Sequence, residues 1–542
     1  MTQQFNMTDY DQEYKNFQWK IPEYFNFAGD VIDKWAEDPK KLAMLWVNDD
    51  GDRKERTFLD FSKASKKLAN VLSAYGVKRD ELIVVVLGRD IEWWEIFTAS
   101  LRMGAVISPG TTQLTSKDIQ YRINTSEAVC FITDNANAAK FDAIEKDCPT
   151  IKAKIVIGEK REGWIGYNEE VEKASEEFKT AETKASDKAI VYFTSGTTGF
   201  PKMVLHHQSY GYAHTTTGKY WLDLRPDDLH WNVSDTGWAK AAWSSYFGPW
   251  NMGAALFTHC TDRFDPIDTL TLLQNNPVTT MCGAPTIYRM LVLQDLSKFK
   301  FPSLRHCVGA GEPLNPEVIE IWKKATETII RDGYGQTESV LLCGSFPCIE
   351  PRFGSMGKPS PGVDLQVIDN DQKIVPPNTE GDIAIKIDPE RPLGLFQEYW
   401  KEPAKTASTE KNGWYLTGDR AYRDEDGYFW FVGRDDDVIL SSGYRIGPFE
   451  VESALLEHDA VAESAVVSSP DEKRGEVVKA FIILVSGFEP TDELKKEIQN
   501  HVKKVTAPYK YPRKIEFVDV LPKTVSGKIR RIELRDQEWA KK

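Results

Sequence analysis

Thr194-Ser-Gly-Thr-Thr-Gly-Phe-Pro-Lys202 follows directly on the apolar run Ala189-Ile-Val-Tyr-Phe193, so a predicted strand ends in a loop of glycine and hydroxyl residues. Glycine lets a backbone wrap closely around an anion, hydroxyl groups donate to its oxygens, and a lysine adds a positive charge. The spacing differs from G-x-x-x-x-G-K-[ST], the P-loop pattern. The stretch therefore predicts a polyphosphate-binding loop at the end of a strand. The alternative interpretation is a flexible Ser/Thr/Gly linker.

The composition is that of an ordinary soluble globular protein, with 542 residues of which 41% are hydrophobic and 28% charged. The net charge of −14 argues against non-specific binding to nucleic acids or anionic membranes. The seven cysteines are scattered and form no CxxC pair, which is typical of reduced thiols. The first thirty residues show no signal peptide or Arg-rich presequence, and no segment approaches the length of a transmembrane helix. We therefore expect a cytoplasmic protein without integral membrane association.

Helical and strand patterns alternate along the chain, which predicts α/β architecture with mostly parallel sheets. Residues 57–75 have helical apolar spacing, with Thr57 as the cap and Gly76 as the stop. Residues 82–87 form a predicted buried strand, and residues 91–103 a second helix that ends at Gly104. Residues 171–187, rich in Glu, Lys, Ala, Ser and Thr, predict a solvated helix or a surface connection.

One domain boundary is predicted at residues 433–437, Gly-Arg-Asp-Asp-Asp. The chain after it has its own alternation of elements: a helix near 450–457, strands at 460–467, 477–485 and 515–520, and a helix at 492–505. About one hundred residues suffice for a small domain. We therefore expect a large N-terminal body of α/β subdomains, residues 1–435, and a small mobile α+β lid, residues 436–542.

Four further segments carry groups suited to a nucleotide. Residues 332–338, Asp-Gly-Tyr-Gly-Gln-Thr-Glu, offer an aromatic face, small residues, a hydroxyl and a carboxylate for Mg²⁺. Asp419, just after a predicted short strand, could accept hydrogen bonds from ribose hydroxyls. The acidic stretch 433–445 and the basic loop 522–531 complete the set. Each segment taken alone is also compatible with ordinary turn or surface chemistry.

In this order and at this spacing, the segments resemble the AMP-forming acyl-CoA synthetases of the adenylate-forming superfamily, over about residues 40–540. Five stretches are similar to the medium-chain members of that family: residues 234–238, 283–290, 442–448, 474–479 and 506–513. The resemblance implies a ligase that joins a medium-chain, branched or aromatic acid to coenzyme A through an acyl-adenylate. ATP and CoA would be cosubstrates, and Mg²⁺ the cofactor.

The resemblance also implies roles for single residues. Lys528 is expected to carry adenylation, with Thr337 at the α-phosphate and Glu338 as the third catalytic residue and metal ligand. The implied ATP-binding residues are Thr194, Ser195, Gly196, Thr197, Thr198, Gly199, Lys202, Gly311, Glu312, Pro313, Asp332, Gly333, Tyr334, Gly335, Gln336, Thr337, Asp419, Arg434 and Lys528. The implied CoA-binding residues are Gln113, Ser442, Gly443, Tyr444, Arg474, Tyr511 and Arg513, and Asp436 matches the hinge.

The acyl pocket is implied at Trp238, Gly283, Gly335, Thr337 and Arg445. Acetate-specific relatives carry tryptophan at the position of Gly335, so glycine implies room for a longer or branched acyl group. His206 matches a family histidine, for which we expect a packing or gating role.

Two alternatives stay open from the sequence. One is another branch of the same superfamily, either an aryl-CoA ligase or an enzyme that loads a carrier protein. The other is a nucleotide-binding protein without catalytic activity. The sequence leaves the oligomeric state open, a homodimer included, and it gives no reason to expect a nucleic-acid partner.

Overall fold

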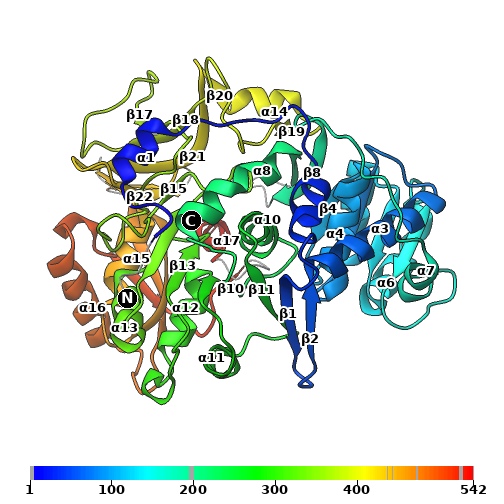
Figure 1. Ribbon diagram of the computed structural model, residues 1–542. Helices are drawn as coiled ribbons and strands as arrows, with labels where there is room; N and C mark the ends of the chain where they lie inside the picture. The colour runs from blue at the N-terminus through cyan, green and yellow to red at the C-terminus, as the bar shows by residue number, and fades with distance from the viewer. Residues whose placement is uncertain are drawn as a thin grey trace.

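The computed structural model describes residues 5–194, 201–435, 437–441, 444–471, 474–523 and 529–540. Within this part of the chain, four sheets and the helices around them form an α/β architecture (Figure 1). The predicted fold class is confirmed, because the two largest sheets are mostly parallel and a smaller mixed sheet lies near the C-terminus. In Figure 1, α3, α4, α6 and α7 lie at the right, and the C-terminal helices α15 and α16 at the left.

An eight-stranded sheet has the order β19-β9-β8-β4-β3-β5-β6-β7. Its strands are β3 (Leu82–Val86), β4 (Val106–Gly110), β5 (Cys130–Thr133), β6 (Ala153–Val156), β7 (Ile165–Gly166), β8 (Lys188–Thr194), β9 (Lys202–His207) and β19 (Glu398–Tyr399). All five residues of β3 are buried, as the apolar run predicted for a strand covered on both faces. The strand predicted before the glycine-rich loop is also confirmed as β8, which pairs antiparallel with β9.

A nine-stranded sheet has the order β16-β15-β14-β13-β12-β10-β11-β1-β2 and is parallel from β14 to β1. Its strands are β1 (Leu42–Asn48), β2 (Arg53–Thr57), β10 (Leu229–Asn232), β11 (Ala255–Cys260), β12 (Thr280–Gly283), β13 (His306–Ala310), β14 (Ile330–Tyr334), β15 (Cys343–Gly344) and β16 (Lys358–Pro359).

Helices surround these two sheets. They are α1 (Tyr10–Asn16), η1 (Ala28–Ile32), α2 (Asp33–Trp35), α3 (Phe58–Ala74), α4 (Ile91–Met103), α5 (Ser116–Ser126), α6 (Asn135–Asp142), η2 (Glu145–Asp147), α7 (Tyr167–Lys173), α8 (Ser209–Thr216), η3 (Thr217–Trp221), α9 (Ala239–Ala241), η4 (Ala242–Tyr246), α10 (Phe247–Asn251), α11 (Pro266–Asn275), α12 (Pro285–Val292), η5 (Leu296–Lys298) and α13 (Pro316–Thr326).

Two predicted helices begin or end at the residues that the sequence indicated. Thr57 caps α3 through a capping box with Asp60, and α4 ends at Gly104 in the left-handed conformation. In the stretch 171–187, the helix α7 ends at Lys173, and a connection that buries Thr183 and Ala185 follows.

A third, antiparallel sheet packs beside these two. It contains β17 (Leu365–Ile368), β18 (Gly381–Lys386), β20 (Glu410–Lys411), β21 (Trp414–Arg423) and β22 (Phe429–Arg434), with α14 (Pro403–Ser408) next to β20. Asp419 lies inside β21, a strand of ten residues. The expectation that Asp419 follows a short strand is therefore wrong, because the strand continues through Asp419 as a ladder with β18 and β22 on either side.

The C-terminal region has its own sheet and core. Its elements are β23 (Ile439–Ser441), β24 (Tyr444–Ile446), α15 (Pro448–Leu456), β25 (Val461–Asp471), β26 (Gly475–Leu484), α16 (Asp492–Val505), η6 (Pro508–Lys510), β27 (Lys514–Phe517) and α17 (Arg531–Trp539). The predicted helix 492–505 matches α16 at both ends. Apolar residues of α15, α16 and the sheet pack together in a cluster separate from the large body.

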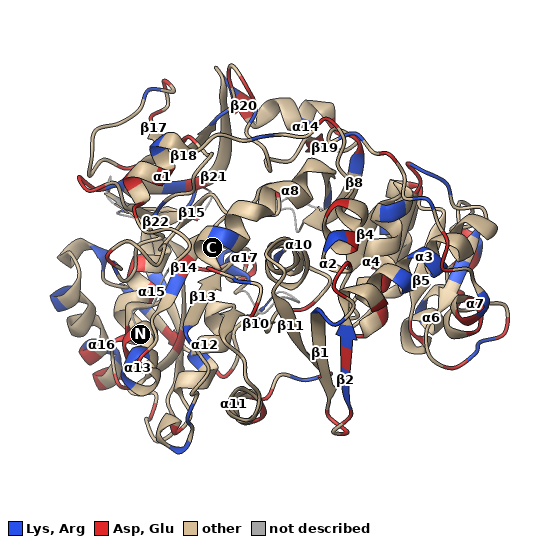
Figure 2. Ribbon diagram, in the orientation of Figure 1, with Lys and Arg blue, Asp and Glu red and all other residues tan. Residues whose placement is uncertain are grey.

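Charge and cysteine placement agree with the composition. Figure 2 shows basic and acidic residues intermixed on outer elements such as α16. All seven cysteines are free, and five of them are buried. No helix in the described part of the chain is long and apolar enough to cross a membrane.

Candidate functional site

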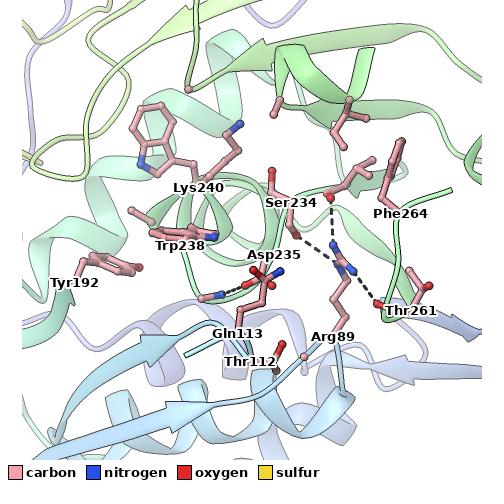
Figure 3. Close-up of a pocket in the computed structure, with 18 of the residues that line it drawn as sticks. Arg89, Thr112, Gln113, Tyr192, Ser234, Asp235, Trp238, Lys240, Thr261 and Phe264 are labelled. Atoms are coloured by element: carbon pink, nitrogen blue, oxygen red, sulfur yellow. Dashed lines mark hydrogen bonds between the residues drawn. The ribbon is translucent and has the colours of Figure 1, made fainter. Parts of the chain in front are cut away.

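A cavity of about 760 Å³ lies where the eight-stranded and nine-stranded sheets face one another (Figure 3). We call it the central cavity. Most of its wall comes from segments that directly follow parallel strands: residues 88–90 after β3, 112–113 after β4, 134–140 after β5, 233–240 after β10, 260–264 around the end of β11, 284–287 after β12, 310–312 after β13 and 335–337 after β14. Open α/β sheets bind ligands outside the carboxyl ends of their strands. The fold therefore gathers loops from both sheets around one cavity.

Arg89 joins the two walls of the cavity. Its guanidinium donates to the backbone carbonyls of Val233 at 3.3 Å, Ser234 at 3.4 Å and Thr261 at 3.4 Å (Figure 3). Arg89 follows β3 of one sheet, whereas its three partners follow or end strands of the other. The arginine thus fixes the separation of the sheets at the cavity.

Gly311 and Glu312 lie at the rim after β13. Gly311 has φ +103°, and a Cβ there would lie 3.1 Å from Lys240 Nζ, so glycine suits both the backbone and the space. Glu312 accepts from Thr286 Oγ1 at 3.1 Å and pairs with Arg289 at 3.1 Å. These contacts hold a loop whose residues were predicted to bind ATP.

Asp419 is brought to the 332–338 segment by the antiparallel sheet. Its Oδ2 accepts hydrogen bonds from the Tyr334 hydroxyl at 2.6 Å and from Gln336 Nε2 at 2.8 Å. Arg434 is opposite Asp419 in the ladder between β21 and β22. Four of the predicted ATP-binding residues therefore meet at one edge of the site, although they come from three different strands or loops.

Glu338 lies in a second cluster with Tyr399 and Lys202. The Tyr399 hydroxyl donates to Glu338 Oε1 at 2.8 Å, and Lys202 Nζ lies 5.0 Å from the centre of the Tyr399 ring. Burial raises the pKa of Glu338, against the lowering effects of the Tyr399 hydrogen bond and the Lys202 charge. Burial, followed by the charge of Lys405, lowers the pKa of Lys202. Thr194 faces Lys202 across the strand pair, at the ends of the predicted phosphate loop.

His206 holds the backbone of Thr337. Its Nε2 lies 2.7 Å from the Thr337 carbonyl oxygen, and its ring stacks on Tyr210 at 3.8 Å. Burial lowers the pKa of His206 to about 3, so the imidazole is neutral. Because a carbonyl can only accept, Nε2 carries the proton and donates. This placement agrees with the packing role expected for His206.

Some predicted residues lie away from the cavity wall. Asp332 is buried and accepts from the Gly333 N–H at 2.8 Å, and burial raises its pKa to about 7. A Cβ on Gly333 would lie 2.4 Å from the Trp221 ring, so this glycine serves close packing. Gly283 and Pro313 are likewise absent from the lining, where Ala284 stands instead. Asp332, Gly333, Gly283 and Pro313 therefore lie outside the lining of the central cavity, and packing within the sheet surrounds the first three.

Of the residues predicted for the acyl pocket, Trp238, Gly335 and Thr337 line the central cavity. The sequence reasoning did not identify Tyr192, Lys240 and Trp243 in the cavity wall, or Tyr399 beside Glu338. Tyr192 is the next-to-last residue of the apolar run 189–193, and its position just before the glycine-rich stretch could have indicated a place in the wall. No sequence pattern marked the other three.

The predicted CoA residues lie in two places. Gln113 lines the central cavity, whereas the others that the structure describes lie in the C-terminal region. Arg513 donates to the Tyr511 hydroxyl at 2.7 Å, and Tyr444 stacks on Tyr509 at 4.2 Å. Arg474 donates its backbone N–H to Asp471 at 2.9 Å. The C-terminal region thus presents arginine and tyrosine side chains, which suit a phosphorylated nucleotide.

Several predictions concern parts of the chain outside the description. They are Ser195, Gly196, Thr197, Thr198, Gly199, Asp436, Ser442, Gly443 and Lys528, together with the side chain of Arg445. Within the described residues, no group of three or more His, Cys, Asp or Glu side chains could hold a metal ion by itself.

Comparisons with known proteins agree with this geometry. A family model described as AMP-binding enzyme matches residues 32–400, and one described as AMP-binding enzyme C-terminal domain matches residues 450–528. The acyl-coenzyme A synthetase ACSM3 of Mus musculus, named mitochondrial, is 52% identical over 98% of this chain and 94% of its own length. ACSM4 of Homo sapiens, also named mitochondrial, is 50% identical over 96% of this chain and 91% of its own.

Two solved structures are similar over nearly the whole chain. A Brucella canis acyl-CoA synthetase is 36% identical, with a TM-score of 0.77, and the match covers 99% of this chain and 100% of that one. The anthranilate CoA ligase AuaEII, in complex with anthranoyl-AMP, is 30% identical, with a TM-score of 0.89, over 96% of this chain and 98% of that one.

The location expected from the sequence needs correction. Both curated relatives carry the word mitochondrial in their names. This finding overturns the cytoplasmic location that we inferred from the composition of the first thirty residues.

Proposed function

This chain belongs to the AMP-binding enzymes, and on that premise we propose that it is an AMP-forming ligase that joins a medium-chain carboxylic acid to coenzyme A. In the first step, a carboxylate oxygen attacks the α-phosphorus of ATP, the bond to the β-phosphate oxygen breaks, and pyrophosphate leaves. In the second step, the CoA sulfur attacks the acyl carbon, the bond to the AMP oxygen breaks, and the thiol proton passes to solvent. The products are acyl-CoA and AMP.

One observation carries the proposal. Two sets of side chains, one around Asp419 and the other formed by Glu338, Tyr399 and Lys202, lie next to the central cavity, whose wall includes Gln113 and Trp238. A carboxylate that receives hydrogen bonds from Tyr334 and Gln336 is fixed in place before a ribose arrives. Orientation and charge compensation are the main contributions that a protein makes to transfer at phosphorus. The arrangement supplies both from fixed side chains.

Glu338 fits a Mg²⁺ site of the kind that shares its ion with a substrate. Mg²⁺ is commonly held by one or two carboxylates, by phosphate oxygens and by waters. Glu338 would supply the carboxylate, and Tyr399 would fix its orientation through the 2.8 Å hydrogen bond. When bound, the ion would neutralise charge on the phosphates. The Lys202 ammonium, 5.0 Å from the centre of the Tyr399 ring, would add a second positive charge.

The neutral imidazole of His206 would position Thr337, which we place at the α-phosphate. Its donated hydrogen bond fixes the Thr337 carbonyl, so the Thr337 side chain is held next to Gly335 at the cavity wall. The catalytic role of Lys528 rests on the sequence resemblance. A lysine suits it, because a flexible point charge can meet the developing charge on carboxylate and phosphate oxygens.

The first experiment measures pyrophosphate release with Mg·ATP and acids from acetate to decanoate, with 2-methylbutyrate and benzoate added, each with and without CoA. We expect release with acids of four to eight carbons, and AMP with acyl-CoA only when CoA is present. Benzoate tests the aromatic alternative, which the similarity to an anthranilate CoA ligase favours. Pyrophosphate without acylated CoA would indicate another acceptor. No release with any acid would contradict the proposal.

Lys528→Ala tests the catalytic lysine. Loss of one preorganised charge commonly costs on the order of 10²–10³ in rate, and we expect that loss in acyl-AMP formation. Lys523→Ala is the matched control, because this lysine lies in the same basic stretch and pairs with Glu463 at 2.9 Å. Near-normal acyl-AMP formation by Lys528→Ala would contradict the assignment.

A further inference from the structure

The segment after β10 places a second tryptophan in the wall of the central cavity. Residues 234–238 pass along the cavity, and the chain then continues as α9 and η4. Trp238 precedes α9, and Trp243 is the second residue of η4. The Trp243 side chain lines the cavity while only 5% of the residue is exposed. The indole is therefore part of a packed wall and still has one face toward the cavity.

Trp243 fills the space that Gly335 leaves. A Cβ on Gly335 would lie 2.2 Å from Cη2 and 3.0 Å from Cζ2 of the Trp243 ring. The same Cβ would lie 2.8 Å from the Val340 carbonyl oxygen. The glycine therefore does not by itself create an open volume, because an indole from another segment occupies the region next to it. The limit of the cavity on this side is set by Trp243.

The backbone that carries Trp243 is held firmly. The next residue, Ser244, is hydrogen-bonded to His230 Nε2 at 2.7 Å, and Ser245 Oγ accepts from Asn232 Nδ2 at 2.8 Å. The Ser245 carbonyl also accepts from Trp94 Nε1 at 2.6 Å. All of these groups are buried and two of them lie on β10. These contacts fix the segment that carries the indole, so the segment cannot be displaced from the cavity wall without breaking them.

We infer that Trp243 determines the size of the acyl group that this enzyme accepts. The inference rests on the proposed function, because it requires the acyl chain to extend from Thr337 past Gly335 into the central cavity. Thr337 is two residues from Gly335, and both line the cavity. A chain that leaves the reacting carboxylate in this direction meets the indole. The Trp243 ring, and not residue 335, therefore excludes acids whose acyl groups are too long or too broad for the cavity.

The test compares acid preference in the wild type, Trp243→Phe and Trp243→Leu. For each enzyme, kcat/KM is measured by pyrophosphate release with acids of four to fourteen carbons and with branched acids. We expect the preference for the longest or broadest acids, relative to the wild-type optimum, to rise at least about tenfold in Trp243→Leu, with Trp243→Phe between the two. The KM for ATP should stay that of the wild type, because the nucleotide contacts around Asp419 are unchanged.

Trp250→Leu is the matched control. Trp250 lies on α10, is fully buried, donates its Nε1 to the Ala43 carbonyl at 3.2 Å and does not line the cavity. Its substitution should lower thermal stability and leave the ratio between acids unchanged. A ratio is insensitive to the fraction of folded enzyme, so general destabilisation cannot imitate the expected shift.

An unchanged acid ratio in folded Trp243→Leu would overturn the inference while the proposed function stands. If Trp243→Leu shows no cooperative melting transition and so does not fold, the ratio of kcat/KM values between acids in Trp243→Phe tests the inference instead. A wild type that releases no pyrophosphate with any acid would overturn the proposed function and this inference together.

Discussion

Replacing Tyr399 by phenylalanine should move the pH dependence of the enzyme toward higher pH. The Tyr399 hydroxyl donates to Glu338 Oε1 at 2.8 Å, and this hydrogen bond favours the ionised carboxylate. Burial acts in the opposite direction and raises the pKa of Glu338. Without the hydroxyl, burial is opposed only by a backbone hydrogen bond and by the charges of Lys202 and Arg434, so the pKa must rise further.

The size of the effect follows from the strength of such a bond. A hydrogen bond to a charged group contributes about 1.5–3 kcal/mol, and one pKa unit corresponds to about 1.4 kcal/mol. Loss of the bond should therefore raise the pKa of Glu338 by about one to two units. Glu338 must be ionised to hold a cation, and a carboxyl group is ionised above its pKa. The acid limb of activity should thus move up by about one to two pH units, with recovery at alkaline pH.

The assay is kcat/KM for Mg·ATP between pH 5 and 9.5, measured by pyrophosphate release with a saturating acid. This parameter reports the pKa values of the free enzyme. Tyr428→Phe is the control, since its hydroxyl donates to the Glu350 carbonyl at 2.7 Å. An acid limb at the wild-type position, or a loss of activity equal at every pH, would refute the reasoning.

Four further predictions concern three other residues. Tyr334→Phe removes one of the two donors to Asp419 and should raise the KM for ATP about tenfold with little change for the acid, which steady-state kinetics would show. His206→Ala should lower kcat about tenfold because the Thr337 carbonyl loses its donor, whereas His206→Gln should retain part of the activity. Because burial holds the pKa of His206 near 3, wild-type activity should show no limb from this residue between pH 5 and 8; a limb that vanishes in His206→Gln would contradict this. The pKa of Asp332 is about 7 in the folded protein, above its unfolded value, so the free energy of unfolding falls as the pH rises from about 4 to 7. In urea unfolding at several pH values, Asp332→Asn should not show this fall. Parallel plots of unfolding free energy against pH for the two proteins would contradict the prediction.

Several elements could be predicted from the sequence because their signals are local. The helix α4 begins and ends at Ile91 and Met103 as predicted, because apolar spacing and a glycine in the left-handed conformation define it within one stretch. The same is true of α16, with Thr491 as its cap. The glycine-rich stretch 194–202 and residues 332–338 were predicted from their chemistry to bind a nucleotide, since few core-forming stretches combine glycine, hydroxyl and charged residues in this way.

Other features depended on packing between distant segments. Tyr399 reaches Glu338 although the two are 61 residues apart, and no pattern near either residue predicts the contact. Asp332 has a carboxylate that could bind a ligand, yet the sheet buries it, and it accepts a hydrogen bond from the backbone N–H of Gly333. Asp419 was expected after a short strand, but the pairing of β21 with β18 and β22 extends the strand through it.

The sequence by itself determined the α/β class, the family and the residues suited to a nucleotide, because periodicity, caps and residue chemistry are properties of short stretches. The tertiary structure alone decided which of those residues face a common cavity and how large that cavity is. Gly335 illustrates the difference: its identity suggested an open pocket, whereas the fold places Trp243 against it. A missing side chain leaves a volume, and only the packing of the rest of the chain decides what fills it.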